Sequence, residues 1–430
     1  EQKRLLGALS VFREPIPLDA MTDQKLNVDE LDSLVEAGLA RHADSDTYDV
    51  HDLIREFLVQ GLDQQAKTDL HNNAITWYQK QGKGSQVALE LIHHLISASR
   101  DEDAATIIVE EGRDLIKEGH IELLGLLETV DTSTLESESA CRIDRLRGEV
   151  LALLGRFDEA EEAFNSAQEP AEKAGLQDVI ADILSNLADI SLKRGDSDES
   201  LSMHRKALEL FIELDDALGA ARSYNNMGYI LRRSSDKAKA LEAYGEVESI
   251  LQGNDSEELI PAQIVLARSL LDLGEHDRAR SHALSSYERS AESEDAILHA
   301  RARAVLGRYY AKTGDSDLAL HHYTDALETM GEAGDPLALV EVSILLGEVL
   351  QDSGRVEEAL DRYREALVIS EANDLRMQIG ELLARLGGVA PDRQRRMEYL
   401  QRALSVFREL GAQARMRDVQ MMVHTAVMGR

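Results

Sequence analysis

Few residues in this chain have types and spacings that could support chemistry. Two adjacent histidine pairs, His93–His94 and His321–His322, invite a metal-binding interpretation. Neighbouring residues on a helix point about 100° apart, however, whereas ligands at positions i and i+4 share a face. Neither pair has a second cluster at ligand spacing, so the sequence predicts no metal site.

The nearest approach to a phosphate-binding loop is GLDQQAKT, residues 61–68. It carries Ala66 in place of the second glycine and follows a predicted helix rather than a strand, so its backbone cannot cradle phosphates. Acidic residues are too abundant for any pair of carboxylates to be informative, and no arrangement of Ser, His and Asp stands out. We therefore expect no catalytic residues, no enzyme activity and no cofactor in this chain.

The elements that would position binding residues come from an internal repeat. Small residues recur every 40 residues, with one step of 39, at Gly148, Ala188, Gly228, Ala267, Gly307, Gly347 and Gly387. A turn residue follows seven positions later in most units, namely Gly155, Gly195, Ser235, Gly274, Gly314 and Gly354. A second small residue and then a bulky or aromatic residue complete most units. Because glycine ends a helix at positive φ and small residues let helices approach closely, each unit is predicted to be a helical hairpin.

This order of small, turn, small and aromatic residues resembles the tetratricopeptide repeat, with units somewhat longer than the usual length of about 34 residues. The resemblance implies an all-α fold in which residues 136–430 form a right-handed superhelix of seven units. The last unit is three residues short between Gly387 and Ala403 and carries Pro391 in its turn. We expect it to be an irregular end unit.

In proteins with this repeat, the first helix of each unit lines the concave side. Helical offsets place a basic and polar stripe on that side: Asn186, Arg222, Asn226, Tyr229, Arg233, Arg268, Arg301, Arg308 and Lys312. The same offsets give Asp189 and Lys193. Related repeat proteins use asparagine at the equivalent positions Asn186 and Asn226 to hold a peptide backbone. We predict that an anionic or peptide partner binds along the third to fifth units. The alternative is that these arginines pair with acids of neighbouring helices.

The composition is that of an acidic, helical protein. The chain has 430 residues, 43% of them hydrophobic, and a net charge of −33, which disfavours nucleic-acid binding because phosphate neutralisation needs clustered Lys and Arg. Only 12 of its 47 basic residues are lysine. Such a surface is favoured in a halophilic cytoplasm, where screening within about 3 Å at 1 M salt removes self-repulsion. An ordinary acidic repeat protein is the alternative. Without a long apolar run or a signal peptide, we expect a cytoplasmic protein with no membrane contact.

Residues 1–62 do not follow the repeat and are predicted to be a small winged-helix domain. The expected elements are an apolar helix at 5–12, an amphipathic helix at 28–37 ended by Gly38, strands at 39–41 and 48–50 around a turn at 44–46, and a helix at 51–62. Over residues 1–61 there are 6 basic against 13 acidic residues. We therefore do not expect this domain to read DNA.

Residues 5–12, the phrase LVEAGLA and above all YDVHDLIREFL resemble the winged-helix module of STAND-type signalling ATPases, the group of MalT-like regulators and NB-ARC proteins. In that family a Met-His-Asp motif opens the last helix, and its histidine touches the phosphate of ADP on the preceding ATPase domain. The resemblance implies nucleotide-state sensing by His51 and Asp52, with Val50 in place of the methionine. The alternative is that both residues cap a helix whose apolar side chains fill a core, namely Leu53, Ile54, Phe57 and Leu58.

Residues 63–135 are predicted to form a helical connector, similar to the one that joins winged helix and repeats in MalT-like proteins. The chain lacks an initiator methionine, so we expect a fragment of a larger protein whose ATPase domain uses ADP or ATP. It would be a sensor region, in which a protein, a peptide or a small anionic inducer in the concave groove controls the nucleotide switch and self-oligomerisation of the full-length protein. The alternative is a free-standing scaffold that docks partner peptides without a nucleotide.

Overall fold

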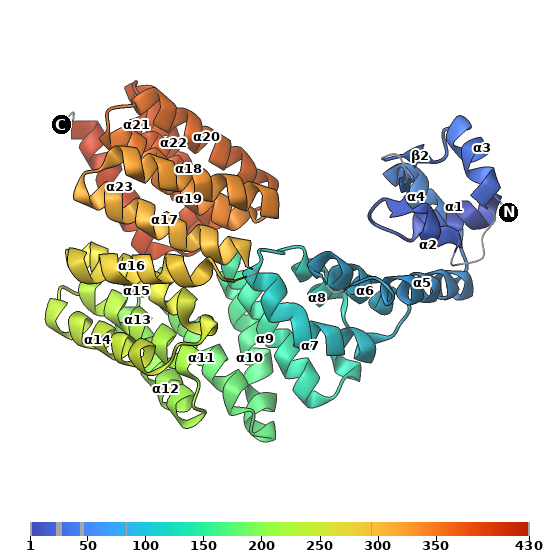
Figure 1. Ribbon diagram of the computed structural model, residues 1–430, viewed down its shortest axis with the longest axis horizontal. Helices are drawn as coiled ribbons and strands as arrows, with labels where there is room; N and C mark the ends of the chain where they lie inside the picture. The colour runs from blue at the N-terminus through green and yellow to red at the C-terminus, as the bar shows by residue number, and fades with distance from the viewer. Residues whose placement is uncertain (1, 23–27, 44–46, 83, 294, 429–430) are drawn as a thin grey trace. The chain divides into compact units, whose positions relative to one another are not determined.

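The computed structural model describes residues 2–22, 28–43, 47–82, 84–293 and 295–428 (Figure 1). The described chain is mostly helical and divides into two compact units, residues 1–116 with 122–143 and residues 117–121 with 144–430. None of its described helices is both long and apolar enough to cross a membrane.

The first unit opens with short elements that include a small sheet. They are α1 (Gln2–Ser10), β1 (Ile16–Pro17), α2 (Leu18–Thr22), the 3₁₀ turn η1 (Val28–Glu30), α3 (Leu31–Glu36), β2 (Arg41–His42), β3 (Thr47–Asp49) and α4 (Asp52–Gln60). The strands pair antiparallel in the order β1-β3-β2, and Tyr48 lies between Ile16 and His42. Strand β1 was not predicted, because Ile16 and Pro17 stand in a proline-rich stretch typical of a turn. Proline is tolerated there because β1 is an edge strand.

The other elements of this region lie close to their predicted positions. The helix expected over 28–37 is divided into η1 and α3, and Gly38 ends it with φ of +70°. The two predicted strands are each displaced by one or two residues. The turn predicted at 44–46 lies outside the described residues.

Connector helices complete the first unit. They are α5 (Gln64–Tyr78), α6 (Ser85–Ser97), α7 (Asp101–Lys117) and α8 (Leu123–Thr129), followed by the 3₁₀ turn η2 (Thr132–Thr134). Phe12 packs edge-on against Trp77, with ring centroids 6.3 Å apart. Arg13 forms an ion pair with the buried Glu90 of α6 at 2.7 Å. The opening segment and the connector therefore share one core.

Helical hairpins follow in the order that the repeat predicts. They are α9 (Ser137–Leu153) with α10 (Phe157–Ala174), α11 (Gln177–Arg194) with α12 (Ser197–Glu213), α13 (Ala217–Arg233) with α14 (Lys237–Gly253), α15 (Ile260–Leu273) with α16 (His276–Ser290), α17 (Ala296–Thr313) with α18 (Ser316–Ala333), α19 (Pro336–Asp352) with α20 (Val356–Ala372), and α21 (Arg376–Val389) with α22 (Arg393–Glu409). The 3₁₀ turn η3 (Glu257–Leu259) precedes α15, and α23 (Gln413–Met428) ends the array. Consecutive helices pack against each other, so the hairpins stack into an all-α superhelix.

The turn inside each of the first six hairpins has the predicted conformation. Gly155, Gly195, Gly274, Gly314 and Gly354 adopt φ values between +76° and +98°. Ser235 occupies the same place in its hairpin with φ of +64°, which costs a residue with a Cβ about 1–2 kcal/mol. The positive φ, rather than glycine itself, is therefore what the turn requires.

In four units the glycine that anchors the repeat faces an aromatic ring of the second helix. A Cβ added to Gly228 would lie 2.4 Å from the Tyr244 ring, and one added to Gly148 would lie 2.6 Å from the ring of Phe164. Both rings are fully buried. The spacing of small and aromatic residues thus encodes a close contact between the two helices of one hairpin.

Aspartate caps many of these helices. In each case its side chain accepts a hydrogen bond from the backbone N–H three residues later, as at Asp196, Asp216, Asp236, Asp315 and Asp335. This bond satisfies an N–H group that has no partner within the helix. Part of the aspartate content of the chain therefore serves to cap helices.

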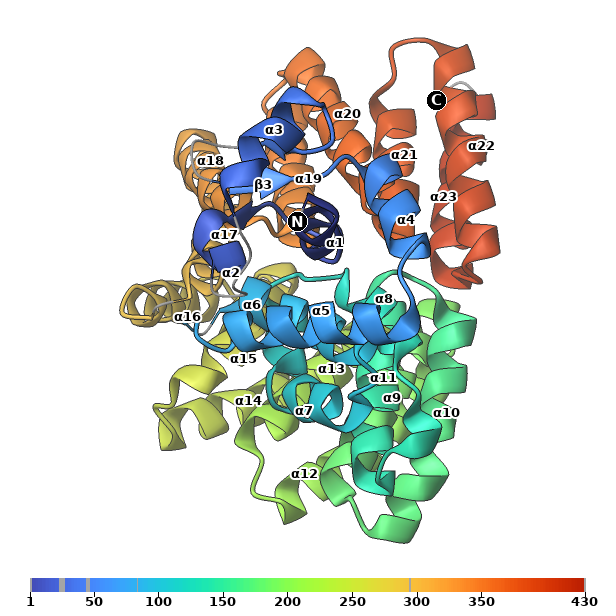
Figure 2. The same cartoon turned by 90° about the vertical axis from the view of Figure 1, so that its right-hand side faces the viewer.

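The superhelix curls far enough to return its last helix to the second hairpin. First helices of successive hairpins contact one another, and α11 also contacts α23. The turn at Gly195 lies beside Arg417 and Ala414 of α23. Figure 2 shows the C-terminal helices, in red, next to the teal helices of the first hairpins. Residues about 200 positions apart in the sequence therefore share one inner surface.

Candidate functional site

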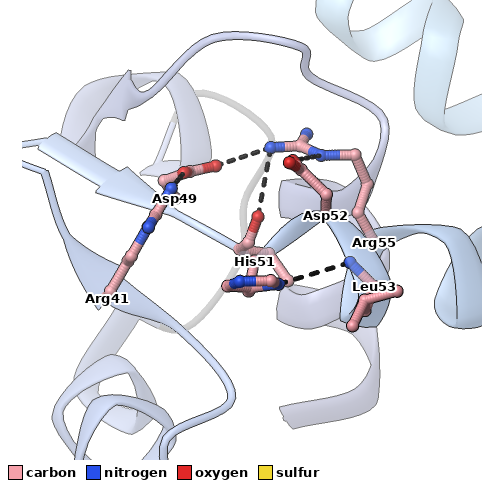
Figure 3. A network of polar contacts seen from close by, with 7 residues as sticks. Arg41, Asp49, His51, Asp52, Leu53 and Arg55 are labelled. Carbon is pink, nitrogen blue, oxygen red and sulfur yellow. Dashed lines mark hydrogen bonds and ion pairs between the residues drawn. The ribbon is translucent and has the colours of Figure 1, made fainter.

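His51 lies at the start of α4 and caps that helix (Figure 3). Its Nδ1 accepts a hydrogen bond from the backbone N–H of Leu53 at 3.4 Å. Asp52 is the first residue of α4, where a carboxylate is stabilised by the helix dipole, and it makes only a long contact of 3.9 Å with Arg55. Both side chains are exposed. Capping therefore leaves most of the imidazole and the carboxylate accessible to a partner.

Asp49, for which no role was predicted, fixes the start of α4. It is 7% exposed, and its carboxylate accepts hydrogen bonds of 2.6 Å from both Arg41 and Arg55. Burial alone would raise the pKa of Asp49, but hydrogen bonds from Arg41 and from the Val50 N–H, together with the Arg55 charge, bring it below the usual value. Arg55 also donates to the carbonyl oxygen of Val50 at 3.2 Å. Strand β3 and helix α4 are thus tied together beside His51.

Helix α4 buries one apolar side and exposes another. Ile54 and Leu58 pack against the core of the first unit, as the capping alternative expected. Leu53 and Phe57, in contrast, are 73% and 77% exposed. Because residues at i and i+4 share a helix face, these two side chains form an apolar strip beside His51.

A cavity of about 230 Å³ lies on the inner surface of the superhelix. Its lining comes from four helices: Asp189, Leu192 and Lys193 of α11, Tyr229 and Arg233 of α13, Met377 and Glu381 of α21, and Ala414 and Arg415 of α23. The last two helices reach this cavity because the superhelix curls back on itself. Apolar and charged side chains thus face the same space.

The two acids of the cavity already have partners. Asp189 accepts a hydrogen bond from Asn226 at 3.0 Å and lies 3.3 Å from His204. Glu381 forms an ion pair with Arg415 at 2.5 Å. Glu381 is therefore paired with a cation, whereas Asp189 is held by a hydrogen bond from a neutral amide.

Two cations of the cavity, Lys193 and Arg233, form no ion pair with a described carboxylate. Lys193 places its Nζ over the ring of Phe157, 5.2 Å from the centroid, and Arg233 lies over the ring of Tyr229 and donates to its hydroxyl at 3.3 Å. Lys193 still contacts solvent, but the surrounding helices withdraw its ammonium from bulk water and lower its pKa, against the charge of Asp189. The cavity therefore presents two cations whose charge no described carboxylate contacts.

Two arginines of the predicted stripe pair with acids of neighbouring first helices. Arg301 forms an ion pair of 3.1 Å with the fully buried Asp335, and Arg308 forms one of 2.9 Å with Asp272. Arg268 is exposed, and its positive charge acts on Glu341 of α19. Arg301 and Arg308 therefore pair with acids of neighbouring helices, which was the alternative to a role in partner binding.

The other stripe residues divide between the cavity and the open surface. Tyr229 and Arg233 line the cavity. Asn226 donates a hydrogen bond to Asp189, which also lines it. Asn186 donates to Glu149 at 3.3 Å and to the Asp182 carbonyl at 2.9 Å, so its amide is occupied. Two more cations, Arg222 and Lys312, are exposed and form no ion pair with a described residue. The stripe thus contributes only part of the cavity, whose second wall the sequence did not indicate.

One group of histidines could hold a metal ion. Among the described residues, His71, His93 and His94 have ligand nitrogens that all lie within 4.8 Å of one another. His71 was not considered a ligand from the sequence, because it stands on a different helix from the adjacent pair. No spacing pattern connects the three positions.

Comparison with known proteins identifies the repeats. Tetratricopeptide repeat families match residues 179–253 and 259–332 in one form and residues 142–165 and 340–365 in another. No curated protein matches the chain.

Several solved structures match this chain at low sequence identity. The Rap conjugation gene regulator of the plasmid pLS20, solved with the Phr* peptide, matches 86% of this chain and 96% of its own with a TM-score of 0.51 and 12% identity. NprR in complex with its cognate peptide NprX matches 94% of this chain and 98% of its own, with a TM-score of 0.43 and 13% identity. A STAND protein with a tetratricopeptide repeat sensor from Pyrococcus horikoshii matches 100% of this chain at a TM-score of 0.41 and 14% identity, and this chain spans 63% of its length. The segment between residues 142 and 365 therefore carries tetratricopeptide repeats, built into an all-α superhelix.

Proposed function

We propose that this chain is the sensor and regulatory region of a STAND-type signalling ATPase, acting in the cytoplasm, and that its inner repeat surface binds a peptide or protein segment. The observation that carries this proposal is the cavity between α11, α13, α21 and α23. Its acids are already paired, whereas Lys193 and Arg233 are not. A site of this kind selects an anionic group.

The lining indicates the chemistry of the partner. Guanidinium groups form charged hydrogen bonds with carboxylates worth about 1.5–3 kcal/mol each. Leu192, Met377 and the ring of Tyr229 supply apolar surface next to the two cations. The cavity fits a side chain or the end of a chain, so we expect a peptide whose acidic residue or terminal carboxylate enters it beside an apolar side chain. The pLS20 regulator, which has a similar fold, was solved with a peptide, and peptides are accordingly the first class to test.

The first unit would connect this binding event to a nucleotide switch. Its order of helix, strand, two helices, two strands and helix is the order of elements in a winged helix. We propose that this segment is a winged helix and that an ATPase domain of the full-length protein covers the exposed strip of Leu53 and Phe57 on α4. His51 and Asp52 would then face the phosphates of ADP. The accessibility of all four side chains is consistent with this role.

The binding proposal is tested with a library of short immobilised peptides that differ in acidic residues and in a free or amidated carboxyl terminus. The wild-type chain should select anionic peptides, and the variant with Lys193→Met and Arg233→Met should bind them at least about tenfold more weakly. Lys312→Met is the matched control, since Lys312 is an exposed lysine of the stripe that does not line the cavity. Selection that is unchanged in the double variant, or equally weakened in the control, would contradict the proposal.

The switch proposal makes a separate prediction. The phosphate-cradling residues would belong to the ATPase domain, so this chain alone should bind ADP no more tightly than about millimolar, as measured by calorimetry. Micromolar binding of ADP to the 430-residue chain would contradict it. A phosphate-loop domain encoded directly upstream of Glu1 would support the switch over the free-standing scaffold.

A further inference from the structure

Three imidazoles meet between helices α5 and α6 of the first unit. His93 and His94 are adjacent on α6, and their rings diverge with centroids 5.1 Å apart. His71 of α5 lies across from both, with ring centroids 5.8 Å from His93 and 5.1 Å from His94. The facing helix therefore supplies what an adjacent pair lacks, a third nitrogen donor near the other two.

The cluster is buried and poorly satisfied by hydrogen bonds. His71 and His94 are 8% and 0% exposed, and His93 is half-buried. Nδ1 of His71 lies 2.8 Å from Nδ1 of His94. Burial lowers the pKa of His71 to about 4 and that of His93 to about 3, and it also lowers the pKa of His94. An uncharged imidazole has one nitrogen with a free lone pair that can bind a metal.

The carboxylate of Glu90 lies next to the cluster, and one of its oxygens has no hydrogen-bond partner. Oε1 of Glu90 is held by Arg13 at 2.7 Å, whereas Oε2 is buried and has no hydrogen-bond partner. Nε2 of His94 is likewise buried without a partner and lies 4.0 Å from that oxygen. A histidine that binds a metal through one nitrogen usually donates its other N–H to a carboxylate. Metal binding at Nδ1 of His94 would place the proton on Nε2 and give both orphaned atoms a partner.

The ring positions agree with a tetrahedral site. A metal about 2.0–2.1 Å from three imidazole nitrogens separates those nitrogens by about 3.3 Å and the ring centroids by about 5 Å. The observed centroid separations are 5.1, 5.1 and 5.8 Å. The ligand nitrogens of the group all lie within 4.8 Å of one another, and the His71–His94 pair, at 2.8 Å, must open by about half an ångström to reach the tetrahedral separation.

We propose that His71, His93 and His94 form a binding site for a divalent transition metal, with zinc as its first candidate, and that Glu90 is a positioning residue for His94. Imidazole donors favour zinc, copper, nickel or cobalt over magnesium and calcium, which take oxygen ligands. Half-buried His93 leaves the fourth coordination position open to water or to another ligand. The bound ion would join α5 to α6 and so stabilise the first unit. This site is independent of the peptide cavity.

The site is tested on the full, untagged chain after removal of metals by chelation and dialysis. Zinc titration by calorimetry should show one ion per chain, and zinc should raise the melting temperature. His71→Gln and His93→Gln should each weaken zinc binding by at least about tenfold. His322→Gln is the matched control, because His321 and His322 form the other adjacent pair but belong to no described group of three ligands.

Cobalt distinguishes a built site from scattered surface histidines. Cobalt bound to the wild-type chain should show the intense visible absorption of tetrahedral coordination, and His93→Gln should lose it. His93 is half-buried, so this variant keeps the proposal testable even where His71→Gln fails to fold, as judged by circular dichroism. A cobalt spectrum like that of the aqueous ion, or zinc affinity lost equally in His322→Gln, would overturn the proposal.

Discussion

Replacing Gly347 by alanine tests whether the contact between the two helices of a hairpin sets the repeat. Gly347 lies in α19, and a Cβ added there would stand 2.3 Å from Cε1 of Tyr363 in α20. Tyr363 is 0% exposed, so its ring has no solvent to move into. Carbon atoms in contact prefer separations of about 3.5–4.0 Å. The ring or the two helices must therefore move apart by more than about 1 Å.

Two effects of this substitution oppose each other. Alanine is favoured over glycine inside a helix by about 1 kcal/mol, whereas overpacking a core costs about 1–3 kcal/mol. Because the added atom would lie so close to a rigid ring, we take the upper end of that cost and expect a net loss of about 2 kcal/mol. Gly245 of α14 is the matched control, since a Cβ there meets nothing within 4 Å. Gly245→Ala should gain up to about 1 kcal/mol, so the two variants should differ by about 3 kcal/mol.

The comparison is made by urea unfolding followed by circular dichroism, with hydrogen exchange of α19 and α20 amides to locate the change, because long repeat arrays do not always unfold in one step. Adding Tyr363→Leu to Gly347→Ala removes the ring and should recover part of the loss. Equal or higher midpoints for Gly347→Ala than for Gly245→Ala would refute the reasoning.

Three further outcomes are expected. Arg301→Ala should lower the free energy of unfolding, measured in urea, by about 1–2 kcal/mol, because it leaves the fully buried Asp335 without a counter-charge. The loss is limited because Arg301 is 41% exposed. Arg222→Ala removes no ion pair with a described residue and should change that free energy by no more than about 0.5 kcal/mol, and equal losses in the two variants would contradict this. The helices packed around Glu341 raise the pKa of its carboxyl group against the charges of Arg268 and Arg301, although part of its side chain is exposed. The folded chain therefore holds that proton more tightly than the unfolded chain, and stability from this group falls as pH rises above about 4.5. Glu341→Gln should therefore raise the melting temperature at pH 7 and not at pH 4, and a constant increment would argue against it. If the acidic surface reflects a high-salt habitat, the melting temperature should rise between about 0.1 M and about 1 M salt, and an unchanged value would leave an ordinary acidic repeat protein.

Most of the repeat could be predicted because its signals are local and occur several times. The turn residues Gly155 and Ser235 stand at the same place in their units, and both have positive φ. The pairing of Gly228 with Tyr244 was readable from a fixed spacing within one hairpin. Each signal depends on residues fewer than about twenty positions apart, a range in which helix geometry alone fixes the neighbours.

The second wall of the cavity could not be predicted, because its position depends on curvature added over many hairpins. Met377 and Arg415 meet Lys193 only when the stack has turned back on itself, and no spacing in the sequence records the angle at each junction. His71 escaped notice for a similar reason, since it reaches His94 through the packing of two helices. Strand β1 is short and contains a proline, so it has no periodic pattern of its own.

The return of α23 to α11 makes the array behave like a ring with a gap. Small changes of angle at the junctions between hairpins add up along the stack. Their sum determines the separation of α23 from α11. The distance between α11 and α23 therefore depends on the angles at all the junctions between them. A molecule that binds between α11 and α23 at one separation therefore favours one pitch of the superhelix. A change in a distant hairpin that alters this separation would weaken the binding, although that hairpin does not contact the molecule.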